Sequence, residues 1–218
     1  MSDVTSTRDL CRLLGGLMLD GANPALLSEL LVHRSASRLG DALGGDLSAT
    51  LSAIEEARGR EGIQATAAEY TRLTVADGRG ARRPVPVPLW EDVHLGGERR
   101  VHGERSRQVR KAYLDAGLGY DGIQQAPADH VGLEFLFVAA LLEEERHGRR
   151  DSSARRDFVA VHLGPCAAAV GWALQHAAKG GVWREVGRSI VQAPFILDGE
   201  PGGRAWELPI APVHVHLE

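Results

Sequence analysis

The amino-acid sequence predicts an all-α protein, and three observations support this prediction. Apolar residues recur at intervals of three and four along most of the chain, which is the spacing of a buried helical stripe. The segment 131–142 is apolar on nearly every helical face, which is typical of a central helix. Prolines 84, 86 and 88 interrupt the helical pattern between residues 78 and 97. We therefore predict a single globular helical domain of two packed helical groups joined by a Pro-rich hinge segment.

The N-terminal group covers residues 1–77. Its first helix carries a clear apolar stripe. Asn23 and Pro24 supply an N-cap and a first-turn proline for a second helix, Asp46 can cap a third, and an Ala-rich segment from about Ile63 to Leu73 forms the last. The stripe residues are Leu10, Leu13, Leu14, Leu17 and Met18, then Leu26, Leu27, Leu30 and Leu31, then Leu47, Leu51 and Ile54.

Residues 78–97 form the predicted hinge. Proline lacks a backbone donor and biases the preceding residue toward extended geometry, so this segment is not an interior helix. Because a solvent-exposed linker rarely contains tryptophan, Trp90 indicates an ordered connection that its aromatic side chain holds in place.

The C-terminal group covers residues 98–193 and opens with a helix from about Glu104 to Leu114. Its basic residues are expected to be solvated and its apolar residues to face inward. The central helix follows Pro127 and Asp129, and Asp129 is predicted to be its N-cap. The residues concerned in the first helix are Arg105, Arg107, Arg110 and Lys111 on the solvated face and Val109, Tyr113 and Leu114 on the inner face.

The end of the chain continues the helical pattern. Glu143, Glu144 and Glu145 close the central helix and are interpreted as a solvated helix end, not a binding patch. Two further helices are predicted, over about 153–178 (bent or interrupted at Gly164-Pro165) and 182–192. Residues 194–218 are predicted to be an irregular tail.

Composition and charge narrow the function classes. The chain has 218 residues and carries 25 Lys and Arg against 29 Asp and Glu, a formal net charge of −4. This mild acidity argues against a nucleic-acid binder. With only Cys11 and Cys166, neither a disulfide framework nor a zinc ribbon is available. The N-terminus lacks the pattern of an export signal, and no uninterrupted apolar run approaches the roughly 20 residues of a membrane span. We expect a cytoplasmic protein without stable membrane insertion.

Candidate catalytic and metal motifs have simpler structural explanations. Residues Gly117 to Gly122 match GxGxxG, but the dinucleotide motif needs a strand before it and a helix after it. A helix C-terminus capped by glycine explains the pattern better. A nucleotide-binding hydrolase using this loop and Asp129 is one alternative function, and a helical DNA-binding regulator is another. His214 and His216 could form half of a metal site, but a frayed tail is favoured, and Cys166 is interpreted as a small buried residue. No catalytic residue, metal or cofactor is predicted.

Three segments, in this order, resemble the TorD/DmsD/NarJ family of chaperones for molybdenum-containing redox enzymes. The family pattern has a Pro-rich stretch before an aromatic, a helix ending in Tyr and Gly, and a Pro-Glu-Asp-His opening of an apolar helix. This sequence departs from it at Ala128, Asp92 and His94. The matching segments are residues 88–94 (PLWEDVH), 110–113 (RKAY) with Gly117, and 127–136 (PADHVGLEFL).

The resemblance implies a non-catalytic, cytoplasmic chaperone. Such a protein would bind the N-terminal twin-arginine signal, or an equivalent segment, of a molybdopterin oxidoreductase catalytic subunit before export, while the cofactor is inserted. A receptor for adjacent arginines and an apolar stretch needs carboxylates beside an apolar groove, and arginine can also stack on tryptophan. For Asp129 a capping role alone is favoured over capping combined with binding. The predicted signal-binding residues are Trp90, Glu91, Asp92, Tyr113, Pro127, Asp129, His130 and Glu134.

Overall fold

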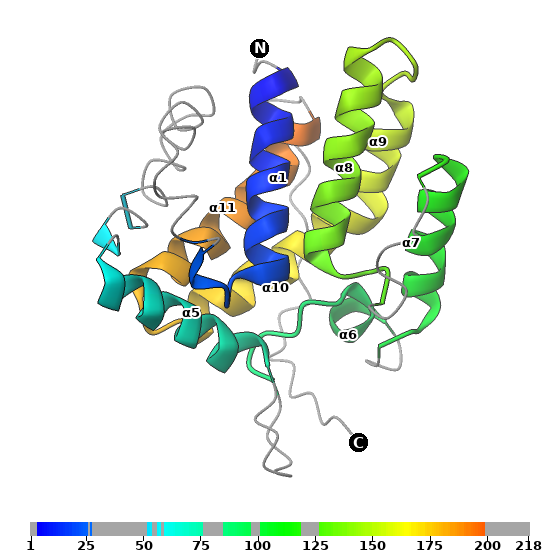
Figure 1. Ribbon diagram of the computed structural model, residues 1–218. Coiled ribbons are helices and arrows are strands. Elements are labelled where there is room, and N and C mark those ends of the chain that lie inside the picture. Colours follow the sequence, from blue (N-terminus) through cyan, green and yellow to red (C-terminus); the bar gives the residue numbers. More distant parts are fainter. Residues whose placement is uncertain are drawn as a thin grey trace.

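Helix α8, Val131–Arg146, is buried along most of its length, as the sequence predicted. The computed structural model describes residues 4–25, 27, 52–53, 56–57, 59–75, 85–96, 101–118 and 127–198. Within these ranges there is no β-strand, so the all-α prediction is confirmed (Figure 1). Besides α8, the elements are α1 (Val4–Asp20), α5 (Arg60–Thr74), α6 (Glu91–Leu95), α7 (Glu104–Asp115), α9 (Ser153–Phe158), the π-helix η1 (Val159–Leu163), α10 (Gly164–Ala177) and α11 (Gly181–Asp198).

Two helix pairs form the main packing contacts, α1 with α8 and α10 with α11. Figure 1 shows α1 standing beside α8. A Cβ on Gly15 would lie 2.9 Å from the carbonyl oxygen of Gly132, and a Cβ on Gly171 would lie 2.6 Å from that of Gly187. Both helix pairs therefore approach closely at positions where a side chain would clash with the opposite backbone.

The N-terminal apolar stripe faces the core, and a tyrosine joins it to α5 and α11. Tyr70 donates its hydroxyl hydrogen bond to the carbonyl oxygen of Met18 at 2.5 Å, and its ring lies 5.0 Å from that of Trp183. The predicted helix at 63–73 is confirmed as α5. Asn23 Oδ1 accepts from the Ala25 backbone N–H at 2.9 Å, as a capping residue does. Most of the helix predicted after Asn23, and the capping residue and apolar stripe of the one predicted after it, lie outside the described residues.

The Pro-rich connection is ordered between Val85 and Trp90, where the structure describes it. Val87 and Leu89 are buried, and the Val87 N–H donates to the carbonyl oxygen of Leu73 at 2.9 Å. Buried aliphatic residues and backbone hydrogen bonds therefore hold this segment, together with the half-buried Trp90. Helix resumes at once in α6, within the range predicted to be non-helical. A hinge role stays a prediction.

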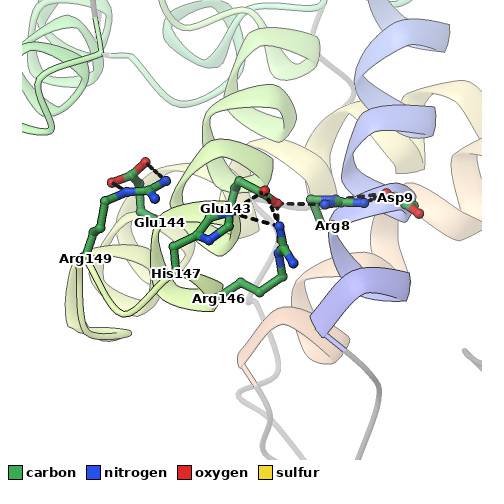
Figure 2. A network of polar contacts seen from close by, with 7 residues as sticks. All are labelled: Arg8, Asp9, Glu143, Glu144, Arg146, His147 and Arg149. Atoms are coloured by element: carbon green, nitrogen blue, oxygen red, sulfur yellow. Dashed lines mark hydrogen bonds and ion pairs between the residues drawn. The ribbon is translucent and has the colours of Figure 1, made fainter.

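The glutamates at the end of α8 are not simply solvated, which corrects the sequence interpretation (Figure 2). Glu143 accepts from Arg8 of α1 at 2.7 Å, from Arg146 at 2.7 Å and lies 3.0 Å from His147 Nε2. These hydrogen bonds, that of Arg146 first, hold the pKa of Glu143 well below its usual range. The other two glutamates pair with Arg149 and Arg155. Local arginines and the neighbouring helices thus engage all three side chains.

Three further details differ from the sequence predictions. Leu114 was expected to face inward but is 60% exposed. Helix α11 continues past Gln192 to Asp198 with Pro194 inside it, so the tail does not begin at residue 194. The predicted irregularity of the 153–178 helix is confirmed, and it takes the form of a π-helical turn just before Gly164.

Gly117 ends α7 as a C-cap, as the sequence favoured. Its φ is +71°, its N–H donates to Leu114, and the Leu118 N–H donates to Tyr113 at 3.1 Å. This is the Schellman arrangement, in which glycine adopts the left-handed conformation at low cost. Residues 119–122 of the GxGxxG match lie outside the described residues, as do His214 and His216.

The helical run Ser153–Ala177 is long and apolar enough by length and composition to cross a membrane, but 61% of its most apolar window is buried inside the protein. Cys166, within this run, is buried and has a free thiol. Its burial agrees with the interpretation of a small core residue. The run contributes to the core of the fold through its contacts with α11, α8 and α6.

Candidate functional site

Four carboxyl groups predicted for the binding site are buried together around the short helix α6. We call Glu91, Asp92, Asp129 and Glu134 the α6 carboxyl cluster. Each is at most 2% exposed. Carboxyl groups seldom lie in a protein interior without partners, since burial strongly disfavours the ionised form. The hydrogen bonds of each member therefore indicate what it can do.

Asp129 does not cap α8, which corrects the sequence prediction. Its Oδ2 accepts from the backbone N–H of Asp92 at 2.8 Å, in the first turn of α6. The N-cap of α8 is His130, whose Nδ1 accepts from the Gly132 N–H at 3.1 Å. The reason is backbone pairing between the two segments, in which Glu91 N–H donates to Asp129 O at 2.9 Å and Val131 N–H donates to Leu89 O at 2.8 Å. This pairing places Asp129 beside the start of α6.

Asp92 in turn caps α7. Its Oδ1 accepts from the Arg105 N–H at 3.1 Å, and its Oδ2 accepts from the Ser106 N–H at 2.9 Å. A Cβ on Gly103 would lie 2.6 Å from Asp92 Oδ1, so glycine makes room for the carboxylate. Three helix starts are therefore linked, because Asp129 caps α6, Asp92 of α6 caps α7, and His130 caps α8.

Glu91 joins α6 to two elements through both carboxylate oxygens. Oε1 pairs with Arg105 Nη1, and Oε2 lies 3.0 Å from His162 Nδ1 on the π-helical turn. Glu91 is 0% exposed, whereas the side chain of Arg105 is 31% exposed. The guanidinium thus reaches from the surface to a buried carboxylate.

Glu134 is the exception within the cluster. Both of its carboxyl oxygens are buried and have no hydrogen-bond partner among the described residues. Burial, followed by the negative charges of Glu91 and Asp129, raises the pKa of Glu134 well above its ordinary value. Burial also raises the pKa of Asp129, against the opposing effect of its hydrogen bonds. Burial without a hydrogen-bond partner therefore favours the neutral form of Glu134 over the ionised form.

The remaining predicted residues surround this cluster. Trp90 forms an isolated antiparallel bridge with His130, and their rings meet edge-on with centroids 5.7 Å apart. Burial lowers the pKa of His130 to about 4, so its ring is neutral and can accept the capping hydrogen bond. Tyr113 donates its hydroxyl hydrogen bond to Ala128 O at 3.0 Å. Pro127, which directly precedes Ala128 in the sequence, is also buried.

The fold thus brings the predicted residues together around α6, but three of the four carboxyl groups already hold groups of this chain, and only Glu134 holds none among the described residues. Glu91 and Asp92 already bind groups of this chain, so they are not free to receive an arginine from outside. The described residues include no group of three or more His, Cys, Asp or Glu side chains that could hold a metal ion. The arrangement is suited to holding α6, α7 and α8 together.

Sequence reasoning missed two members of this junction. Arg105 was expected to be solvated, and His162 was not considered. His162 lies 71 positions from its partner Glu91, and no local pattern identifies such a contact. The glycine at position 103, directly before the start of α7, was a signal that a group from elsewhere in the chain could cap this helix. It does not identify Asp92 as that group.

Comparison with protein families identifies a family to which this chain is similar. Residues 39–169, more than half of the chain, match the family described as nitrate reductase delta subunit. No curated protein matches this sequence. The matched range contains the whole α6 carboxyl cluster, with Trp90, Tyr113, Pro127 and His130.

Proposed function

Because the chain belongs to the nitrate reductase delta subunit family, a family of molybdoenzyme-maturation chaperones, we propose that it binds the N-terminal segment of a molybdenum-containing oxidoreductase subunit. The bound segment is a twin-arginine signal or an equivalent N-terminal sequence. Binding in the cytoplasm delays export until the cofactor has been inserted and the subunit assembled. The chaperone itself performs no catalysis.

The family match is the observation that carries this proposal. It spans the three segments that resemble the TorD/DmsD/NarJ pattern, from Pro88 through Leu136, and it extends on both sides of them. All eight predicted site residues fall within it. Short motifs of this kind are weak evidence singly, and their occurrence in order within one family match is much stronger.

Trp90 is the predicted residue best placed for direct contact with the client segment. Its side chain is half-buried, and its Nε1 donor has no partner among the described residues. The ring can stack with an arginine guanidinium, whereas the indole N–H is itself buried and does not face a ligand. The buried Glu91 and Asp92 contribute indirectly, by holding α6 and α7 in place beside it.

Isothermal titration calorimetry with synthetic client N-terminal peptides tests the proposal. We expect saturable binding of a peptide with two adjacent arginines and a following apolar stretch. A scrambled peptide of the same composition is the control and should bind weakly. Absence of binding to several such peptides, together with no capture of a cofactor-free catalytic subunit, would overturn the proposed function.

The role of Trp90 is tested with a matched tryptophan on another helix. Trp90→Ala should weaken peptide binding, whereas Trp172→Ala, at a side chain 41% exposed on α10, should leave it unchanged. Far-UV circular dichroism checks that both variants stay helical. Trp90→Phe keeps most of the packing and has a ring that attracts a cation less strongly than indole does, so it separates a binding role from an anchoring role if Trp90→Ala unfolds.

A further inference from the structure

A cavity of about 300 Å³ lies between α7, α8 and the α9–η1 run. We call it the α7–α9 cavity. None of its lining residues belongs to the α6 carboxyl cluster, but His162 contacts Glu91, and the Val161 carbonyl oxygen accepts from Arg105 at 3.4 Å. A volume of this size is at the lower end for ligand pockets and accommodates one or two amino-acid side chains. Its apolar lining comes from Ala112, Ala116, Phe137, Ala154, Phe158 and Val161.

Aromatic rings form the floor of this cavity. Phe137 and Phe158 meet edge-on with centroids 4.6 Å apart, and Tyr113 packs on Phe137 at 4.5 Å. Each of these rings is buried against the core, so the floor is formed before any ligand binds. Such a surface favours an apolar side chain, since burial there removes apolar area from water.

Carboxylates stand at the edge of the same cavity. Asp157 is exposed and makes no ion pair or hydrogen bond through its side chain among the described residues. Asp115 pairs with Lys111 at 2.5 Å, but the two side chains are 62% and 75% exposed. An exposed pair of this kind contributes little and exchanges readily. Against these two carboxylates the lining contains one arginine, Arg150, so the place for a further cation is at Asp157 and Asp115, next to the apolar lining.

Arg150 supplies an unused donor in the cavity wall. Its Nη2 donates to Ala116 O at 3.1 Å, while its Nε is buried and has no partner among the described residues. A buried N–H without an acceptor is costly, and because this one has no accessible surface, a ligand reaches it only if the Arg150 side chain moves. An apolar side chain next to a cation is the chemistry of an arginine-bearing apolar peptide.

We propose that the α7–α9 cavity is the docking surface for an apolar residue of the client N-terminal segment, with a neighbouring arginine on Asp157 and Asp115. This inference rests on the proposed function and assigns its contact surface. His162 lines the cavity and lies 3.0 Å from Glu91 Oε2. Glu91 of the α6 carboxyl cluster thus acts as a positioning group for His162 in one wall of the cavity.

Calorimetry with one twin-arginine peptide tests this assignment. Asp157→Lys reverses the charge at the edge, and Ala154→Leu fills part of the cavity. We expect each to weaken binding about tenfold or more, which corresponds to about 1.4 kcal/mol. Glu56→Lys is the control, because Glu56 is an exposed residue elsewhere in the chain and undergoes the same charge change. Circular dichroism verifies that all variants are folded.

A charge-swap peptide completes the test. Replacing the peptide arginines by glutamates should abolish binding to the wild type and restore part of it to Asp157→Lys. If the wild type binds the peptide and both cavity variants bind equally well, the cavity assignment is wrong while the proposed function stands. If the wild type binds no client peptide, both are overturned.

Discussion

Asp129 accepts a hydrogen bond from the backbone N–H of Asp92 at 2.8 Å, although the two residues lie 37 positions apart in the chain. Asp92 extends this connection to α7, because its own carboxylate accepts from the backbone N–H groups of Arg105 and Ser106 at the start of that helix. Two buried carboxyl groups therefore set the positions of two helix starts. The stability of this junction should depend on each of them.

Asp92→Ala should destabilise the protein by about 2–4 kcal/mol, because it leaves the buried N–H of Ser106 and that of Arg105 without their acceptor. Urea unfolding followed by circular dichroism measures this change. Asp115→Ala, which removes an exposed carboxylate from α7, the helix that Asp92 caps, is the control and should change stability by less than about 0.5 kcal/mol. Equal effects of the two substitutions would contradict the capping role.

The effect of Glu134→Gln on the free energy of unfolding should be more favourable at neutral pH than at acidic pH. The folded-state pKa of Glu134 is raised, chiefly by burial, so the unfolded chain releases this proton at lower pH than the folded chain does. Stability is therefore lost as pH rises above the ordinary pKa, by about 1.4 kcal/mol per pH unit until the folded-state pKa is reached. Urea unfolding of both proteins at about pH 4.5 and about pH 7.5 measures the effect. A stability difference that does not change with pH would show that Glu134 ionises normally.

His130 should make the protein sensitive to acid. Burial lowers its pKa to about 4 in the folded state, so between the ordinary pKa of 6.5 and about 4 the unfolded chain binds a proton that the folded chain does not. This contribution to stability is complete above pH 6.5 and is lost as the pH falls toward 4. The loss is about 3 kcal/mol at pH 4.5.

His130→Asn removes the titrating group and keeps a side-chain oxygen that can cap α8. Between about pH 7.5 and about pH 4.5, this variant should lose about 3 kcal/mol less stability than the wild type does. The change with pH is the readout, because the variant also loses the ring contact with Trp90 at every pH. Parallel pH profiles would count against the prediction.

Glu143→Gln should weaken the attachment of α1 to α8. The carboxylate accepts from Arg8 at 2.7 Å and from Arg146 at 2.7 Å, and its lowered pKa means that this contribution is present above the ordinary carboxyl pKa and fades in acid. We expect a lower Tm than for Glu104→Gln, which affects only exposed contacts with Arg107 and Gln108 on the same helix. The difference should shrink between about 0.05 M and about 0.5 M salt, since exposed charges are screened. A salt-independent difference would point to a packing effect.

Local pattern was enough to predict most of the described helices. Leu10, Leu14 and Leu17 are buried at the spacing predicted for α1, and the all-apolar stretch after His130 forms the buried α8. Gly117 was correctly interpreted as a helix end because its neighbours fit a C-cap better than a phosphate loop. These predictions succeed since helix formation and burial depend on residues three to five positions apart.

The errors arise where a long-range partner replaces a local one. Asp129 has the sequence position of an N-cap for α8, yet its carboxylate caps α6, and His130 takes the cap of α8 instead. Arg105 looks solvated on a helical wheel, yet it reaches Glu91. Leu114 looks inward-facing, yet it is exposed because no element covers that side of α7 among the described residues.

The amino-acid sequence by itself therefore determines that the chain is helical, which side chains form its core and which family it belongs to. Tertiary structure alone decides that Glu91 meets His162 across 71 positions, that burial raises the pKa of Glu134 and that an apolar cavity forms beside Asp157. The physical reason is that periodicity records contacts within one helix. Hydrogen bonds and charge interactions between buried groups depend instead on how separate helices pack.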